Sequence, residues 1–399
     1  MFKSRVRDKG QLKQSVSTLD FESYDIGSTH GFLPEEEPTS TFGDSASANL
    51  KSLEELGKEI PELLEEHKLR RTVDKMKLIP SGAFEMLSRG EVVMATRIYA
   101  FLASAYVHQL EEPPVRKLPR ALAVPFSGLS KRIGRNFPIL SYDLYALNNW
   151  RRLDKNGPIA LENMDTIQKF VTLKDEPWFV LVHVEMEAEA APAITSIGRL
   201  QQAVLRDDQE SARFALETIA ESIKRTIKTL NRMPEGNDPN LYAFTFRPYI
   251  GMFEKVTYEG VENLGKSPTF RGETGAQSSI IPSLDLALGI RHQKTGLTDY
   301  VAEMTNYMPG AHREFIEEVR KNETARPVRE YIRDEGKPST VKRYNECIET
   351  IIEFRQKHLE FAVNYIFTKV KDSHGTGGTP FMKWLAQLRD ETKEQILPT

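Results

Sequence analysis

The chain has 399 residues with a hydrophobic fraction of 39%, and its 54 basic and 57 acidic residues give a formal net charge of -3. This length is enough for one large domain or two of ordinary size, with an ample core. The balanced charge argues against a nucleic-acid partner. No apolar run reaches the roughly 18 residues that a membrane span needs, so no membrane partner is expected.

Cysteine usage and the N-terminal sequence predict a reducing compartment. Cys347 is the one cysteine of the sequence, which excludes an intrachain disulfide and a thiolate metal cluster. The first residues lack the apolar region of a secretory signal peptide. We therefore expect a cytoplasmic protein.

The first stretch of the chain is polar and then becomes periodic. Residues 1–50 are rich in Ser, Asp, Glu and Gly, and we expect them to be extended or weakly ordered, with Phe32 and Leu33 as an anchor. Apolar residues recur at helical spacing over 50–79. Pro61 lies inside this run and predicts a break or a helix start.

The middle of the chain continues in the same way. Residues 83–111 are predicted to be helical, the proline-punctuated stretch 118–138 a connector, and 139–150 a further helix. Asp175, Glu176 and Pro177 form a helix start, and the helix is expected to run to about Pro192. Another amphipathic helix is predicted over 199–232. Because little of the sequence alternates as a strand does, the predicted fold class is all-α.

A long helix is predicted over 339–370, because apolar residues recur there at steps of three and four. Ile351, His358 and Ala362 share one face, so His358 is expected to point inward, one turn after Arg355. An inward imidazole beside a cation suits a haem, with the nitrogen on iron and the arginine on a propionate. The alternative is a hydrogen-bonded core histidine that binds no ligand.

Three loops carry residues that are unusual for a purely structural role. The aromatic segment 240–251 contains Arg247, which needs an anion; a substrate carboxylate and a structural salt bridge are the two interpretations. Small and hydroxyl residues fill 271–279, where a backbone can approach a ligand closely. The glycine-rich loop 374–379 is either a flexible connector or a lid over a pocket.

Several sequence runs occur together in an order that one family shares. They are LPRALAVPFSGLSKRIG, ALNNW with ENMD, FRPYIG, GAQSS, MPGAHREF, FRQKHL and GTGGT. With these runs the chain resembles the indoleamine 2,3-dioxygenases, in a bacterial-type form related to the tryptophan 2,3-dioxygenases. The resemblance covers residues 116–399, whereas the first part of the chain matches only in helical character.

The resemblance implies an all-α, two-domain haem protein. Residues 1–150 would form a small N-terminal helical domain with a connector, and residues 151–399 a large helical domain, with haem b between them. The implied reaction adds dioxygen across the indole C2–C3 bond of L-tryptophan or a relative and yields N-formylkynurenine. The implied partners are a small indole and dioxygen, and the implied oligomeric state is a monomer.

The resemblance also assigns roles to single positions. His358 corresponds to the proximal ligand of the haem iron and Arg355 to the arginine that meets a propionate, while Thr274 and Ala276 adjoin the cofactor. Arg247 corresponds to the receptor of the substrate carboxylate. The other substrate-binding positions are Phe179, Tyr142, Tyr145, Tyr242, Gly275 and Thr376.

Some positions depart from the family pattern. His183 stands where the vertebrate enzymes carry a distal serine, and we assign it a catalytic role in hydrogen-bonding the indole N–H or bound oxygen; the alternative is a side chain that merely lines the pocket. Tyr145 and Ala146 replace a cysteine and a valine, and Ala243 removes one ring of an aromatic pair. Glu273 replaces a glycine, which would add negative charge near the amino-acid end of the substrate.

These departures keep two other functions open. One is a haem enzyme that acts on a substituted indole with a different outcome. The other is a haem-binding or gas-sensing protein without turnover. A pocket in which large and small side chains have been exchanged can change its preferred indole, because close packing discriminates single methylene groups.

Overall fold

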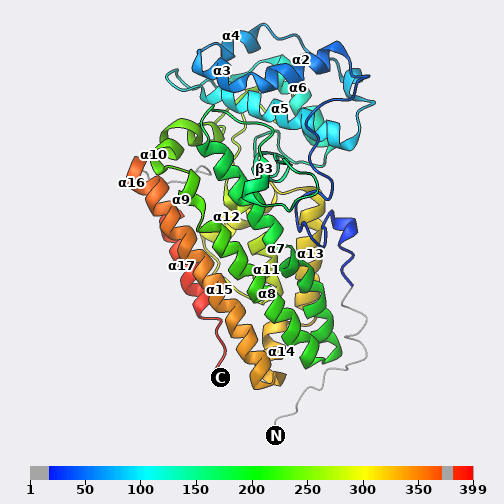
Figure 1. Ribbon diagram of the computed structural model, residues 1–399, viewed down its shortest axis with the longest axis vertical. Coiled ribbons are helices and arrows are strands. Elements are labelled where there is room, and N and C mark those ends of the chain that lie inside the picture. Colours follow the sequence, from blue (N-terminus) through cyan, green and yellow to red (C-terminus); the bar gives the residue numbers. More distant parts are fainter. Residues whose placement is uncertain (1–17, 371–380, 399) are drawn as a thin grey trace.

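The computed structural model describes residues 18–370 and 381–398. Short helices from the first third of the chain form a layer across one end of a bundle of long helices, and Figure 1 shows this layer in blue and cyan above the bundle. Apart from four two-residue strands and two isolated bridges, the described residues form helices and loops. The all-α prediction is confirmed.

The polar N-terminal segment is anchored on the bundle before the layer begins. After the short helix η1 (Glu22–Tyr24), Ile26 and Phe32 are buried in an apolar cluster that they share with the second half of α7 (Asp175–Arg206). Leu33 is fully buried in the neighbouring cluster. The predicted anchor at Phe32 and Leu33 is therefore confirmed, because these two side chains tie the segment down without a helix.

The layer begins where the sequence becomes periodic. Ser88 starts its longest helix with a capping box, in which the Ser88 hydroxyl accepts from the N–H of Glu91 and the Glu91 carboxylate accepts from the N–H of Ser88. Pro61 lies in the first turn of a helix, as predicted. The layer consists of α2 (Ala48–Lys58), α3 (Ile60–Glu65), α4 (Leu69–Asp74), η2 (Ser81–Phe84), α5 (Arg89–His108) and α6 (Arg120–Arg132).

Two predictions for the region after α5 are wrong. The stretch 118–138 is not a connector, because α6 occupies most of it with Pro125 inside the helix. Pro125 is buried on the same apolar face as Phe126 and packs toward α5, so tertiary burial outweighs the lost backbone hydrogen bond. The helix predicted over 139–150 is reduced to η3 (Asp143–Leu147), a single π-helical turn.

The predicted end of α7 near Pro192 is also wrong, because α7 is 32 residues long and ends at Arg206. A proline inside a helix disrupts the backbone ladder around it. Ser222 repairs this gap: its hydroxyl donates to the carbonyl of Glu189 over 2.6 Å and accepts from the N–H of Ala193 over 3.3 Å. A side chain from the neighbouring helix thus lets α7 continue through Pro192.

The next helix consequently starts later than the predicted 199–232. The chain turns at Asp207, whose φ of 60° is left-handed, and α8 spans Gln209–Leu230. Asp208 caps α8 by accepting from the N–H groups of Glu210 and Ser211. The two helices then pack along their length.

The rest of the bundle is completed by the C-terminal half of the chain. The long helix α15 (Pro338–Ala362) lies between α8 and α17, and Figure 1 shows it in orange along one side. The further elements are η4 (Leu161–Asn163), α9 (Met233–Gly236), α10 (Pro239–Leu241), η5 (Tyr242–Phe246), η6 (Arg247–Ile250), η7 (Gly275–Gln277), α11 (Ile280–Ala287), α12 (Gly296–Thr305), α13 (Gly310–Ala325), α14 (Val328–Glu335), η8 (Val363–Phe367), α16 (Thr368–Val370) and α17 (Phe381–Lys393). The predicted helix over 339–370 is confirmed, with a π-helical turn near its end.

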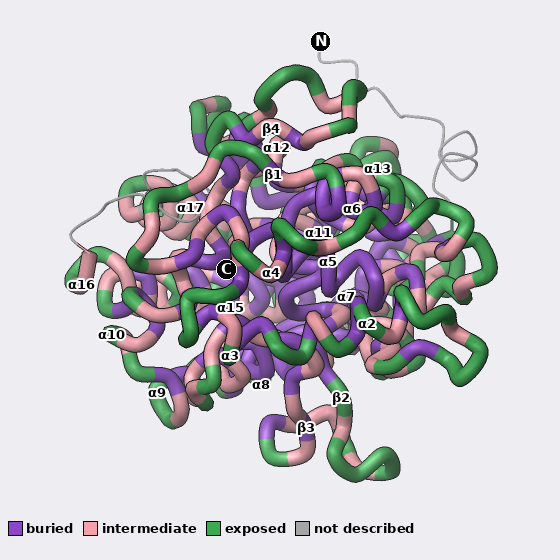
Figure 2. Tube along the Cα trace, turned by 90° about the horizontal axis from the view of Figure 1, so that it is seen from above, coloured by how far each residue is buried: buried purple, intermediate pink, exposed green. Residues whose placement is uncertain are grey.

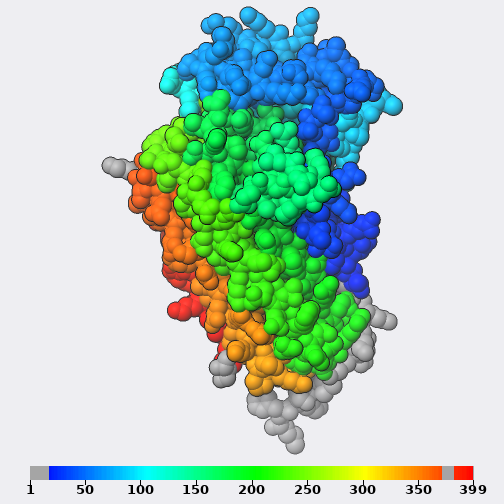
Figure 3. Space-filling model, viewed as in Figure 1, coloured from blue at the N-terminus to red at the C-terminus, as the bar shows by residue number. Residues whose placement is uncertain are grey.

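The core runs through both parts of the molecule. One apolar cluster joins the layer to the first half of α7, and a second fills the bundle around the second half of α7, α8 and α15. Figure 2 shows the buried stretches gathered in the middle, with α5 and α7 among them, and Figure 3 shows blue and cyan residues covering the upper end of the bundle. The predicted division at residue 150 stays a prediction.

The strands are short and tie loops together. β1 (Lys117–Leu118) pairs in parallel with β4 (Thr257–Tyr258), and β2 (Arg151–Arg152) pairs antiparallel with β3 (Met164–Asp165). In the described parts of the chain, no helix combines the length and the apolarity that crossing a bilayer requires.

Candidate functional site

The N-terminal end of α7 carries the distal candidates. Glu176, in its first turn, is fully buried and accepts from the N–H groups of Phe170 and Val171 at 2.8 and 2.9 Å, which fixes where the helix begins. Burial raises the pKa of Glu176 to about 7 despite these bonds. Phe179, His183 and Glu187 follow at four-residue steps, so they lie along one face of α7.

Three tyrosines of the described chain sit on π-helical turns; two of them contact Phe179 and the third contacts one of those two. Tyr145 lies on η3, Tyr242 on η5 and Tyr365 on η8. The ring of Phe179 is 5.0 Å from that of Tyr242 and 6.4 Å from that of Tyr145, and the rings of Tyr242 and Tyr365 are 5.8 Å apart. π turns are rare and are found frequently at functional sites, so their convergence marks this region independently of any motif.

His183 is held in one tautomer. Its Nδ1 lies 2.8 Å from the carbonyl oxygen of Phe179. Because a carbonyl only accepts, Nδ1 carries the proton and Nε2 is left as an acceptor. Burial lowers the pKa of His183, so the ring is neutral near pH 7. The ring of Phe179 is 4.7 Å away, and the ring of Tyr142 meets His183 edge-on at 6.0 Å.

A buried carboxyl joins the segments that surround His183. Glu187 is 1% exposed, and its Oε1 accepts from the hydroxyl of Tyr142 over 2.9 Å and from that of Ser278 over 2.8 Å. Burial raises the pKa of Glu187 to about 7. The sequence did not single out Glu187; its only signal is a carboxylate one turn after His183 on an otherwise apolar face.

His358, on α15, faces the same interior space as His183. Burial among protein atoms and, to a lesser degree, the nearby His183 together lower its pKa to about 4. Yet its side chain is exposed by accessible surface. The imidazole thus lies among protein atoms and still borders accessible space. Within the described residues no group hydrogen-bonds the His358 imidazole. The alternative of a hydrogen-bonded core histidine is therefore not supported by these residues.

Arg355, one turn before His358, is held by two neighbouring helices. Its Nη2 donates to Oδ2 of Asp285 on α11 over 2.5 Å, and its Nη1 donates to the hydroxyl of Thr392 on α17. Burial raises the pKa of Asp285, but the charges of Arg355 and His292 lower it below its usual value overall. His292 in turn lies 2.7 Å from Glu391 through Nδ1. The sequence missed His292 and Glu391, because acids and histidines this far apart carry no spacing signal.

Arg247 lies beside the aromatic cluster. It begins the one-turn helix η6 and hydrogen-bonds the phenol of Tyr242; burial raises the pKa of Tyr242 to about 12, and Arg247 partly offsets that rise. The structure therefore places the predicted carboxylate receptor next to the predicted ring contacts. The role itself stays a prediction.

The small-residue segment runs along the opposite wall. Thr274 caps η7 by accepting from the N–H of Ala276. Gly275 is exposed, and a Cβ added there would meet no atom within 4 Å, so it borders open space. Gln277 fastens this segment to the distal side, since its Oε1 accepts from the N–H of Tyr142 over 3.0 Å. Thr376 and the loop 374–379 lie outside the described residues.

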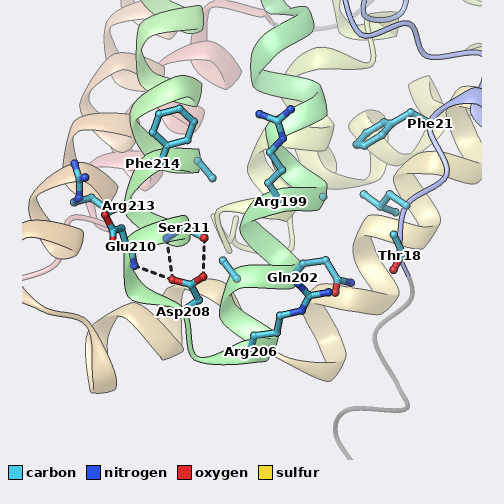
Figure 4. A pocket seen from close by; sticks show the side chains of 14 residues that line it. Thr18, Phe21, Arg199, Gln202, Arg206, Asp208, Glu210, Ser211, Arg213 and Phe214 are labelled. Carbon is cyan, nitrogen blue, oxygen red and sulfur yellow. Dashed lines mark hydrogen bonds between the residues drawn. The ribbon is translucent and has the colours of Figure 1, made fainter.

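The structure thus brings the described candidates together from five separated stretches of sequence. Figure 4 shows a different hollow, of about 650 Å³, at the far end of α7. Arg199, Arg206 and Arg213 line it with Phe21 and Phe214. None of the predicted site residues lies in it, and its arginines belong to an exposed surface, so they are suitable positions for control variants.

Known proteins resemble this chain over most of its length. The profile of the family described as Indoleamine 2,3-dioxygenase matches residues 20–374. The chain is 31% identical to Indoleamine 2,3-dioxygenase 2 of Homo sapiens over 95% of this chain and 96% of that protein. It is 33% identical to Indoleamine 2,3-dioxygenase 1 of Mus musculus over 86% and 88%. It is 28% identical to Indoleamine 2,3-dioxygenase of Saccharomyces cerevisiae over 93% and 92%.

Proposed function

This chain belongs to the indoleamine 2,3-dioxygenase family, a family of haem-dependent oxidoreductases, and on that premise we propose that it opens the pyrrole ring of L-tryptophan or a related indole to an N-formylkynurenine-type product. The observation that carries the proposal is the pair His183 and His358. They come from two helices, and they are close enough for His183 to contribute to the lowered pKa of His358.

The residues present fit a haem b. His358 is neutral near pH 7 because its pKa is about 4, so a ring nitrogen is available as an axial ligand. Nε of Arg355 is buried without a hydrogen-bond partner, which suits an incoming propionate. Thr274 and Ala276 would adjoin the macrocycle. When bound, ferrous haem supplies the activation of dioxygen.

The chain's own residues would bind and orient the substrate. Arg247 takes the carboxylate of the amino acid as a charge-assisted pair. Phe179, Tyr145 and Tyr242 enclose the indole and exclude water from it. His183 accepts the indole N–H through Nε2, since Nδ1 is committed to a backbone carbonyl. The proposal also includes contacts from Tyr142, Gly275 and Thr376, in a cytoplasmic monomer whose partners are the indole and dioxygen.

One observation keeps a substituted indole as the second candidate. Tyr145 is buried, and its hydroxyl is directed to Glu176 at 3.3 Å, while its neighbour Ala146 is small and also buried. This wall is therefore shaped differently from a wall built of cysteine and valine. If L-tryptophan binds to the protein but its ring is not opened, the protein is instead a haem enzyme that acts on a substituted indole with another outcome.

The decisive experiment is turnover of the ferrous protein with L-tryptophan in air. We expect N-formylkynurenine, detected by its absorbance and mass. In Arg247→Ala we expect at least a roughly 100-fold loss of kcat/KM with an unchanged haem spectrum, because a charged hydrogen bond to the carboxylate is removed. Arg199→Ala, which removes an arginine from the hollow in Figure 4, is the matched control and keeps wild-type rates.

His358→Ala tests the cofactor assignment separately. It should lose the absorbance of histidine-ligated haem while keeping its helical circular dichroism. A His358→Ala protein with an unaltered haem spectrum would refute the axial role. An Arg247→Ala protein without haem would show that Arg247 is structural.

A further inference from the structure

A histidine that the mechanism above does not use lies between two acids beside Arg355. The side chain of His292 is 14% exposed. Its Nδ1 lies 2.7 Å from Oε2 of Glu391 on α17, and its Nε2 lies 3.4 Å from Oδ2 of Asp285 on α11. Ionised carboxylates only accept hydrogen bonds, so the ring bonds both of them when both of its nitrogens carry a proton. His292 thus links the same two helices that hold Arg355.

The turn after α11 brings His292 back toward Asp285. The N–H of Ile290 donates to the carbonyl of Asp285 over 2.8 Å, which closes the end of the helix. Gly289 has a left-handed φ of 67°, and a Cβ at this position would lie 2.9 Å from Cβ of Arg329. Because this turn is tight, the imidazole returns to Asp285 only seven residues further along the chain.

Glu391 is held from the other side of the ring. It is 6% exposed, and its Oε1 accepts from the side-chain amide of Gln387, one turn earlier on α17, over 2.7 Å. Its Oε2 is the atom that faces His292. Thr392, the next residue of α17, accepts from Nη1 of Arg355. The acid that meets His292 and the hydroxyl that meets Arg355 are therefore neighbours, so movement of one moves the other.

His292 and Arg355 reach the same oxygen of Asp285. Nη2 of Arg355 donates to Oδ2 over 2.5 Å, and Nε2 of His292 lies 3.4 Å from that atom. Burial raises the pKa of Asp285, but the charges of Arg355 and His292 lower it below its usual value overall, so this acid is ionised near pH 7. Together with Glu391 the cluster contains two carboxyls, and Arg355 supplies only one positive charge. A protonated His292 supplies the second.

This arrangement leaves one nitrogen of Arg355 for a ligand. Its Nε is buried and has no hydrogen-bond partner among the described residues, whereas both Nη atoms are bound to neighbouring helices. A propionate at Nε brings a further negative charge to a guanidinium that already pairs with Asp285. Two acids on one cation repel each other in a dry site, unless a second cation also holds one of them.

We propose that His292 is a positioning residue for the haem-binding arginine: it holds Asp285 and Glu391 in place, so that Arg355 binds a propionate through Nε while Asp285 keeps Nη2. This assignment rests on the proposed function, because it assumes haem in that site. It adds to that function a second cation, which offsets the charge that the propionate brings. His292 acts through Arg355 and touches no reacting atom.

The rate of haem loss tests this role without any turnover. Haem transfer from the ferric protein to apomyoglobin is measured for the wild type and for His292→Gln, whose amide reaches one acid but carries no charge. We expect haem to leave His292→Gln about 10-fold faster, because residues that orient a cofactor contact have effects of this size. His67→Gln is the control and keeps the wild-type rate: His67 also lies beside an acid, 3.4 Å from Glu111, but on the exposed surface of the layer.

An altered haem shows whether His292 acts through the propionate. Iron protoporphyrin IX dimethyl ester has the same macrocycle but offers Arg355 no carboxylate. With this ester, the wild type and His292→Gln should lose the cofactor at rates within about twofold of each other. If the ester does not bind, an Arg355→Lys background replaces it. A single ammonium cannot serve Asp285 and a propionate at once, so adding His292→Gln there should change the rate by less than about twofold.

The outcomes separate this role from a structural one and from ring opening. Wild-type rates of haem loss in His292→Gln would overturn the role, and so would an acceleration that is equally large with the dimethyl ester. Circular dichroism checks folding, and His292→Leu, which removes both bonds, replaces the glutamine variant if that variant does not fold. The expected rates in a wild type that makes no N-formylkynurenine would support His292 and overturn ring opening alone. Ring opening with no effect of His292 would do the reverse.

Discussion

At the scale of single residues, the hydrogen bond from His183 to the carbonyl of Phe179 decides what the imidazole can do. A neutral histidine has one donor and one acceptor nitrogen, and here the donor is used within α7. The nitrogen that remains for a ligand is therefore an acceptor. It matches the indole N–H, which is a donor only.

This predicts that methylation of the indole nitrogen weakens binding. In the wild type, 1-methyl-L-tryptophan should bind about 10-fold or more weakly than L-tryptophan, because the donor is lost and Nε2 of His183 is left unpaired. In His183→Leu the difference should shrink to about twofold. Dissociation constants from the haem absorption band are the measurement, and equal binding of both ligands to the wild type would refute the acceptor role.

At the scale of helices, proline is where sequence and structure agree least. Pro61 begins a helix as predicted, because its missing N–H costs nothing in a first turn. Pro125 and Pro192 lie inside helices, contrary to prediction. The reason is not local: Pro125 is buried in an apolar face, and Ser222 of another helix satisfies the backbone beside Pro192.

Ser222 should therefore contribute more to the stability of the fold than an ordinary serine does. Ser222→Ala leaves a buried N–H and a buried carbonyl of α7 without that partner, and we expect it to lower the free energy of unfolding by about 1–3 kcal/mol. In a Pro192→Ala background the N–H of Ala193 can bond the carbonyl of Glu189 within the helix, so this loss should be smaller. Denaturant unfolding of the four proteins of this cycle measures the coupling, and simple additivity would contradict it.

The C-terminal helix α17 should control how firmly Arg355 is held. Thr392 of α17 accepts a hydrogen bond from Arg355 and is fully buried. Thr392→Val keeps the volume and removes this acceptor, so on the proposed function we expect haem to leave about 10-fold faster. Haem transfer from the ferric protein to apomyoglobin gives the rate. Thr324→Val, at an exposed hydroxyl of α13, is the control, and equal rates would mean that the hydroxyl of Thr392 does not help to hold Arg355.

The candidate site was predictable to the extent that its residues carry a local pattern or a family resemblance. The helical face of His358, and the segments of Arg247 and Gly275, were visible in the sequence. Glu187 and Glu273 were harder to recognise, because the sequence contains 57 acidic residues and their spacing does not show which of them are buried. Only the fold shows which are buried. The π turns were not predicted, because each spans only 5 residues, which is too short to show a period of its own.

At the scale of the whole molecule, buried acids should make the protein less stable in mild alkali. The unfolded chain releases glutamate protons near pH 4.5, whereas burial raises the pKa of Glu176 and Glu187 to about 7 and of Glu273 and Glu323 to about 8. Above pH 4.5 the folded state therefore binds more of these protons than the unfolded state. Raising the pH through this window lowers the free energy of unfolding.

The histidines act in the opposite sense but at lower pH. Burial lowers the pKa of His108, His312 and His358 to about 4, so their effect is complete once the unfolded chain loses its histidine protons near pH 6.5. Between pH 6.5 and 8 the change in the free energy of unfolding comes mainly from the carboxyls, which contribute on the order of 1 kcal/mol each. We expect a lower melting temperature at pH 8 than at pH 6.5, with a smaller decrease in Glu323→Gln and no change in the decrease in Glu85→Gln. An equal or higher melting temperature at pH 8 would contradict this.

The π-helical turns η3, η5 and η8 have one more consequence, which concerns insertion and deletion. A π turn holds one residue more than an α turn, so deleting one residue there returns the helix to its regular repeat and rotates the residues on one side of the turn by about 100° relative to those on the other. Such a deletion would move Tyr145, Tyr242 or Tyr365, which are themselves buried core residues, to another side of its helix. The turn would be more regular, but the ring contacts beside Phe179 would be lost. The positions of these rings thus depend on the number of residues in each turn. A relative that lacks one residue at such a turn is expected to lose or change its substrate.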